Sequence, residues 1–176
     1  MKRLSICLLM LVLFCSRAYA ATAEDLQYLG TCEWNATDVS ILDRIPLSVV
    51  ELHRLKGGRV IFIQSPIERD QGILGIYYFR SKDIYIRVWS GWPGGYSRTL
   101  AHEYGHFLYH ETGPSWPRWV RDEIEPYGDE GFAEAYATYC TSGSTWSQDL
   151  TSAIKEINTV AERLLMKEKG VESNAE

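Results

Sequence analysis

The chain has 176 residues, with 18 Lys or Arg, 23 Asp or Glu and a formal net charge of −5. This acidic balance excludes nucleic acid as an expected partner, because proteins bind phosphate backbones through clustered positive charge. The length suits one compact domain with a hydrophobic core of its own.

The N-terminus has the three parts of a secretory signal peptide. The basic pair Lys2-Arg3 precedes an apolar run, Leu4–Phe14, and the small-residue pattern Ala18-Tyr19-Ala20 follows. We therefore expect residues 1–20 to be a signal peptide and the protein to be secreted, either extracellular or periplasmic in a host that retains it. The apolar run is shorter than the roughly 18 to 20 residues that span a bilayer, so no membrane span is expected.

The first part of the remaining chain predicts a helix and three strands. Asp38–Leu55 carries apolar residues at helical spacing, and Pro46 inside it predicts a kink or two consecutive helices. Arg59–Gln64 is a β-branched run typical of a strand. Ile73–Phe79 and Asp83–Trp89 are further strand candidates joined by a short polar connection, which predicts a hairpin.

The second half predicts helices separated by turns. The first helix begins near Ser97 or Thr99 and ends at Gly113-Pro114. Ser115–Gly128 is rich in prolines, glycines and tryptophans and is expected to be irregular. The second helix is expected over Asp129–Cys140, with Asp129 as its cap.

A third helix is expected to begin at Ser147. Its apolar stripe predicts core packing and consists of Leu150, Ile154, Ile157, Val160, Ala161, Leu164 and Leu165. Together, these elements indicate an α+β fold. We expect a single domain over residues 21–169, followed by a polar tail at residues 170–176.

The predicted helix after residue 97 contains the pattern His-Glu-x-x-His, formed by His102, Glu103 and His106. Residues four apart lie about one turn apart on one helical face, so both imidazoles can reach the same cation. Glu103 points about 100° around the helix, away from the ligand set. Zinc in such a site lowers the pKa of a bound water to about 7, and Glu103 is expected to take that water's proton.

A third protein ligand must come from elsewhere in the chain. Metzincins supply a histidine about ten residues after the first, but that position is Thr112, so the metzincin class is rejected. His110 lies too far along the helix to close a tetrahedral site with His102, and we expect it at the surface or beside a ligand. His53 is expected to be a packed or exposed histidine.

Two carboxylates on the following helix remain as candidate ligands. Glu130 and Glu134 are four residues apart, and apolar neighbours argue against two merely solvated acids. In one assignment Glu130 binds zinc, while Glu134 accepts a hydrogen bond from the free ring nitrogen of a ligand histidine. The reverse assignment stays open, because spacing alone does not say which carboxylate faces the metal.

These residues carry a resemblance to a known group. His102–His106 and the stretch Glu130–Tyr136 resemble the gluzincin metallopeptidases related to the catalytic domain of anthrax lethal factor and to the secreted Pro-Pro endopeptidases. The resemblance implies a zincin-like fold, in which a small mixed sheet packs against the active-site helix and further helices carry the third ligand. It also implies Glu130 as the zinc ligand and Glu134 as the hydrogen-bond acceptor.

The same resemblance implies a tyrosine that donates a hydrogen bond to the tetrahedral intermediate. Tyr127 is the matching candidate, and Tyr136 and Tyr139 are alternatives. In such enzymes a sheet-edge strand pairs with the extended substrate backbone, and Asp83–Trp89 is the expected edge. Three tryptophans are expected either to line the cleft or to pack, namely Trp89, Trp92 and Trp116.

Two cysteines, Cys32 and Cys140, lie outside the predicted signal peptide. In an exported protein they have one intramolecular pairing, so we expect a disulfide bond that stabilises the fold. The alternative is a free Cys32 thiolate that caps the metal in a latent form.

The sequence therefore predicts a secreted zinc metalloendopeptidase with one Zn²⁺ per chain. It is expected to hydrolyse a peptide or protein substrate by Glu103-assisted attack of a zinc-bound water. One alternative is a catalytically inactive, zinc-stabilised binding module, against which the presence of Glu103 argues. The other is a zinc hydrolase that acts on a non-peptide amide.

Overall fold

A computed structural model describes residues 43–64, 74–88 and 96–171. Within these ranges the chain is mixed α and β and mostly helical, with five α-helices, one short 3-10 helix and three strands. The expected signal peptide, Cys32 and most of the expected polar tail lie outside the described residues. None of the described helices is long and apolar enough to cross a bilayer.

The sheet has the order β1-β3-β2, with strands β1 (Val60–Gln64), β2 (Gly75–Tyr78) and β3 (Asp83–Val88). β3 pairs with β1 in parallel and with β2 in antiparallel orientation, so the expected hairpin is confirmed. The expectation that the Asp83–Trp89 strand forms the sheet edge is wrong, because β1 and β2 flank β3 on both sides. The alternating pattern of this strand reports burial of one face and carries no information about its strand neighbours.

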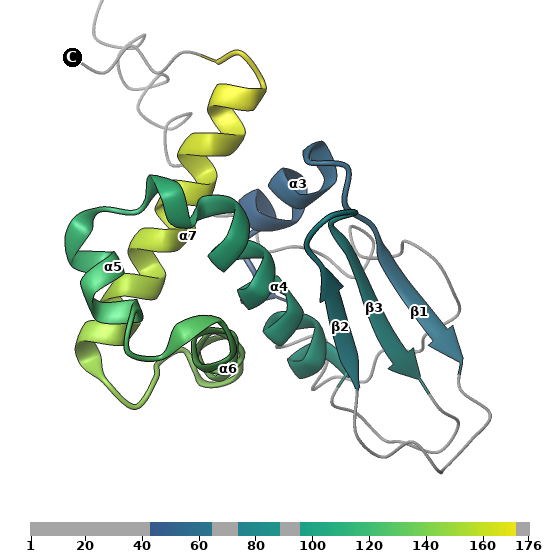
Figure 1. Ribbon diagram of the computed structural model, residues 1–176, viewed down its shortest axis with the longest axis horizontal. Coiled ribbons are helices and arrows are strands. Elements are labelled where there is room, and N and C mark those ends of the chain that lie inside the picture. Colours follow the sequence, from purple (N-terminus) through teal and green to yellow (C-terminus); the bar gives the residue numbers. More distant parts are fainter. Residues whose placement is uncertain (1–42, 65–73, 89–95, 172–176) are drawn as a thin grey trace, which may run out of the picture.

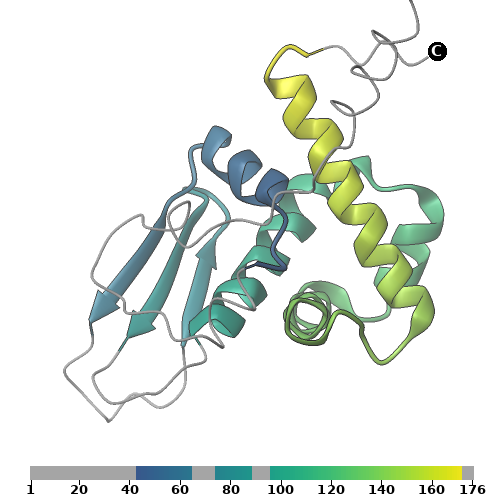
Figure 2. The same cartoon turned by 180° about the vertical axis from the view of Figure 1, so that it is seen from behind.

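Helix α4 lies at the centre of the molecule, between the sheet and three of the other helices. Figure 1 shows α4 with the strands on one side and α5, α6 and α7 on the other, and Figure 2 shows the same arrangement from behind. Helix α3 packs mainly against α7 and also contacts α4. The helices are α3 (Leu47–Leu55), α4 (Tyr96–Thr112), α5 (Arg118–Ile124), α6 (Gly128–Ser142) and α7 (Gln148–Glu168), with the 3-10 turn η1 at Gly113–Ser115.

Most helix ends follow local signals in the sequence. α4 ends just before Gly113-Pro114, and the Ser147 side chain accepts a hydrogen bond from the Leu150 N–H at the start of α7. Pro46 is the residue before the first turn of α3, where a missing N–H costs nothing. The expectation of irregular structure over Ser115–Gly128 is wrong in its middle, because Pro117 precedes α5 in the same way.

The core lies on both sides of α4. Buried side chains of this helix include Leu100, Tyr104, Phe107 and Leu108. The apolar stripe predicted for α7 is confirmed as core, since Leu150, Ile154, Ile157, Val160, Ala161 and Leu165 are all buried. Leu164, the remaining member, is partly buried and packs against them. Helix α4 packs against both the sheet and α6. The candidate site lies where residues of β2, α4 and α6 line a common cavity.

Candidate metal centre

Helix α4 carries the two histidines of the motif on one face. The rings of His102 and His106 lie 4.9 Å apart between centroids, one helical turn from each other. The residues between and beside them, Ala101, Tyr104 and Gly105, are buried. Packing of these buried residues therefore fixes the position of the helix backbone from which the two imidazoles project.

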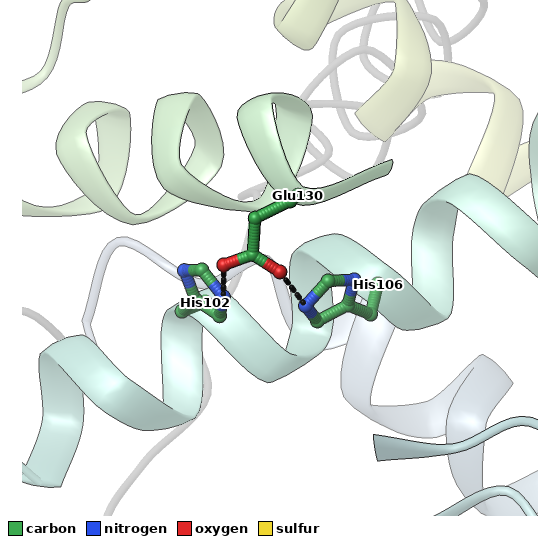
Figure 3. A group of neighbouring side chains, drawn as sticks. All are labelled: His102, His106 and Glu130. Atoms are coloured by element: carbon green, nitrogen blue, oxygen red, sulfur yellow. Dashed lines mark ion pairs between the residues drawn. The ribbon is translucent and has the colours of Figure 1, made fainter. Parts of the chain in front are cut away.

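Helix α6 brings the third candidate ligand over these rings. The Glu130 carboxylate lies between them, with Oε1 3.2 Å from Nε2 of His102 and Oε2 3.4 Å from Nε2 of His106 (Figure 3). One donor atom from each of the three residues falls within 4.8 Å of the others. Two atoms that bind one tetrahedral zinc ion at about 2.0–2.1 Å are roughly 3.4 Å apart, so this donor set fits zinc.

The two helices approach closely enough for this because one of them carries a glycine at the crossing. A Cβ atom on Gly105 would lie 2.6 Å from the backbone Cα of Ala133. No real Cβ makes such a contact, so only glycine allows the backbones to come this near. Gly105 therefore allows α6 to place the Glu130 carboxylate close to the two histidine rings. The His-Glu-x-x-His pattern does not indicate this role.

Glu103 lies on the adjoining side of α4, where its side chain is almost completely buried at 4% exposure. Burial raises its pKa to about 7, and the nearby His106 and a hydrogen bond from the backbone N–H of Tyr77 act in the opposite direction. The pKa of His102 is lowered, first by burial and then by the neighbouring His106. His102 is therefore neutral near pH 7, the form in which imidazole binds metals.

A carboxylate orients the second histidine. Nδ1 of His106 donates to Oδ1 of Asp129 at 2.6 Å, which leaves Nε2 free to face Glu130. Asp129 was expected as a helix cap, but α6 begins at Gly128 and Asp129 lies in its first turn. The one feature of the sequence that points to this contact is the position of Asp129 next to Glu130.

Glu134 lies beside the other histidine, as the sequence led us to expect. Its Oε2 is 3.6 Å from Nδ1 of His102, slightly beyond hydrogen-bond distance, and its Oε1 pairs with the guanidinium of Arg98. Glu134 is therefore within reach of the His102 ring without a hydrogen bond to it in this conformation.

The candidate tyrosines do not gather at this centre. Tyr127 packs against Trp146 with ring centroids 5.9 Å apart, and it is absent from the described cavity lining around the histidines. The buried Tyr136 donates its hydroxyl to Asn158 at 3.3 Å, and Tyr139 packs against Tyr136. The structure thus brings together His102, Glu103, His106 and Glu130, while Tyr127 stays apart.

The remaining sequence candidates lie away from the candidate metal ligands or outside the described residues. Trp116 is buried and donates its indole N–H to Thr112, and it lines a separate cavity. His53 is buried behind α4. Cys140 is buried in α6, and burial raises the pKa of its thiol to about 12. Its expected partner Cys32, and the tryptophans at positions 89 and 92, fall in undescribed segments.

A cavity of about 630 Å³ opens over the candidate ligands. Strand β2 forms one wall and the helices α4 and α6 form the other, through residues that include Gly75, Ile76, Tyr77, Glu103 and Glu130. Within the part of the chain that the structure describes, β2 is the edge strand next to this cavity, so it replaces β3 as the candidate strand for pairing with a ligand backbone.

The donor set, the buried Glu103 and the adjoining cavity occur together in one place. We compared the chain with protein-family models, with curated proteins and with solved structures, and no match was found in any of the three comparisons. The geometry of this centre is therefore the basis of the proposed function.

Proposed function

We propose that the chain is a secreted zinc metalloendopeptidase of the gluzincin type, with His102, His106 and Glu130 as the metal ligands. The observation that carries this proposal is the convergence of two Nε2 atoms and one carboxylate at 3.2 and 3.4 Å, with a buried glutamate in the same cavity. A purely structural zinc site has four protein ligands and needs no such acid. Three protein ligands with Glu103 beside them support a catalytic site.

When bound, zinc lowers the pKa of a water in its open position to about 7 and polarises a peptide carbonyl. Glu103 is suited to accept the proton of the attacking water and to pass it to the leaving amine. Its pKa of about 7 without metal would fall beside a bound cation, so it would act as a base in the loaded protein. The Glu130 side chain is 80% exposed, which leaves substrate access on that side.

The free edge of β2 supports a peptide as the substrate. The Leu74 carbonyl accepts from the N–H of Arg87 on β3. In the alternating antiparallel pattern, the backbone groups of Gly75 and Tyr77 then face away from β3 and toward the cavity. The N–H of Tyr77 donates to Glu103, so the groups that would pair with a peptide are those of Gly75 and the carbonyl of Tyr77. An extended peptide that pairs with this edge would pass over the histidines, and such pairing favours a peptide over a non-peptide amide.

The test is cleavage of an unbiased peptide library by zinc-loaded protein, analysed by mass spectrometry. We expect wild type to cleave extended peptides and Glu103→Gln to lose at least about 100-fold of this activity while it keeps near-stoichiometric zinc. Glu162→Gln, at an exposed position on α7, is the matched control and should cleave like wild type.

Equal cleavage by wild type and Glu103→Gln would refute the mechanism. Zinc binding without cleavage of any peptide would favour the binding module, and cleavage of non-peptide amides alone would favour the other hydrolase. Metal analysis tests the ligand set separately. Loss of zinc is expected in His106→Ala, and undiminished zinc in that variant would exclude the site.

A further inference from the structure

Asp129 engages two histidines at once. Its Oδ1 accepts from Nδ1 of His106 at 2.6 Å, and its Oδ2 accepts from Nε2 of His110 at 2.9 Å. His110 lies one turn beyond His106 on α4 and is not in the group of candidate ligands. The three side chains therefore form a chain of hydrogen bonds that ends at a metal ligand.

The ring of His110 is held by aromatic side chains from three parts of the fold. Tyr77 of β2 stacks on it, with centroids 6.1 Å apart and planes at 26°. Phe79, in the β2–β3 turn, lies 6.1 Å away at 32°, and Tyr109 meets it edge-on at 5.6 Å. These contacts limit the rotation of the imidazole, so its Nε2 is directed at Asp129 although the side chain is 39% exposed.

Asp129 has less support of its own. Its side chain is 37% exposed, and the hydrogen bonds it makes within the described residues are those to His106 and His110. A half-exposed carboxylate without a second partner has other rotamers open to it in which it is solvated. His110 adds a second hydrogen bond to Asp129 in the rotamer that faces His106.

We propose that His110 is a positioning residue for the metal centre: it holds Asp129, and Asp129 in turn fixes the tautomer and orientation of His106. Partners of this kind raise the basicity of a ligand imidazole, and their loss typically lowers metal affinity about 10- to 100-fold. Because Tyr77 and Phe79 clamp His110, the same chain of contacts links strand β2 to the metal ligands. The inference rests on the metal site of the proposed function and does not depend on peptide cleavage.

The experiment measures zinc affinity by competition with a chromogenic chelator, in metal-free protein that is reloaded. We expect His110→Ala to weaken zinc binding about tenfold and His110→Gln to restore most of the loss, because the glutamine amide can also donate to Asp129. The visible absorption spectrum of Co²⁺-loaded protein should change in His110→Ala and return toward wild type in His110→Gln. Arg121→Ala, at an exposed position on α5, is the control and should bind zinc like wild type.

A double-mutant cycle separates this route from a general effect on the helix. In an Asp129→Ala background, His110→Ala should cause no further loss of zinc affinity, because the two residues act in series. An equal loss in both backgrounds, or a His110→Ala affinity within about twofold of wild type with an unchanged Co²⁺ spectrum, would overturn the proposal. Wild-type protein that binds no zinc would overturn this inference and the proposed function together, whereas protein that binds zinc and cleaves nothing affects only the latter.

Discussion

The two walls of the cavity differ in how firmly the chain holds them. On the helical wall, α4 and α6 approach until Gly105 faces the backbone of Ala133, and Phe132, Ala133 and Ala135 are fully buried. On the strand wall, β2 is an edge strand of the sheet that the described residues form, and its neighbours Leu74 and Phe79 are 40% and 55% exposed. The arrangement of the candidate ligands thus depends on close helix packing, while the strand wall is more open to solvent.

The largest effect is expected from a change that separates the helical wall. In Gly105→Val, the new side chain would meet the Ala133 backbone, which cannot move aside as a flexible side chain does. We expect the free energy of unfolding to fall by about 3 kcal/mol and the zinc content of purified protein to fall toward zero. Urea unfolding and metal analysis measure the two effects.

Gly113→Val is the matched control for this change, since a Cβ at position 113 meets no atom within 4 Å. The control should keep its zinc and most of its stability. Near-wild-type zinc content in Gly105→Val would mean that the close crossing of α4 and α6 does not set the ligand geometry.

His53 joins the strand side of the molecule to α4, and its protonation should loosen that junction. Its Nε2 donates to the carbonyl of Lys82 in the β2–β3 turn at 2.6 Å, and its ring packs edge-on against Tyr104 and Phe107 of α4. Burial lowers the pKa of His53 to about 4, although the same hydrogen bond and the nearby Asp83 and Glu111 oppose the shift. The unfolded chain therefore binds this proton more tightly than the folded protein does.

Because the folded pKa lies below the unfolded value of about 6.5, stability is lost as pH falls from about 6.5 to 4. We expect this group to account for roughly 2–3 kcal/mol of the loss. His53→Gln can keep a donor for Lys82 but has no charge to gain. The difference in unfolding free energy between wild type and His53→Gln should therefore shift by that amount between pH 7 and pH 4. Parallel curves for the two proteins would contradict the assignment.

Features with a local cause were predictable from the sequence. Ser147 caps α7 through its own side chain, and Gly113-Pro114 follows the last turn of α4, so both helix ends depend on residues close by. The pairing of His102 with His106 needs only the helical period. The prolines and glycines of Ser115–Gly128 predict irregular structure and hide α5, whereas proline is well tolerated just before the first helical turn, as at Pro117.

Features that depend on distant contacts could not be predicted in the same way. β3 is the central strand because it also pairs in parallel with β1, and the residue pattern of β3 does not indicate this pairing. The hydrogen bond from His106 to Asp129 depends on where α6 crosses α4, which is determined by the contact between Gly105 and Ala133. The spacing of Glu130 and Glu134 predicts two carboxylates on one face of a helix. The distance of that face from α4 depends on how the two helices pack, which the spacing does not indicate.

The smallest of these effects, and the one that best separates the two walls, is expected at the strand wall. A Cβ on Gly75 would lie 2.6 Å from Oε1 of Glu103 and 2.6 Å from Cγ2 of Thr99, which are both ends of side chains. Gly75→Ala should therefore displace the Glu103 carboxylate while the fold and the metal ligands stay in place. We expect full zinc content and a fall in peptide cleavage of about tenfold, or roughly 1.4 kcal/mol in the activation barrier. Gly113→Ala is the control, because a Cβ at position 113 meets no atom within 4 Å, and it should leave zinc content and cleavage unchanged.

Loss of zinc in Gly75→Ala would show that the strand wall also supports the ligands. Unchanged cleavage in this variant would show that β2 does not position Glu103.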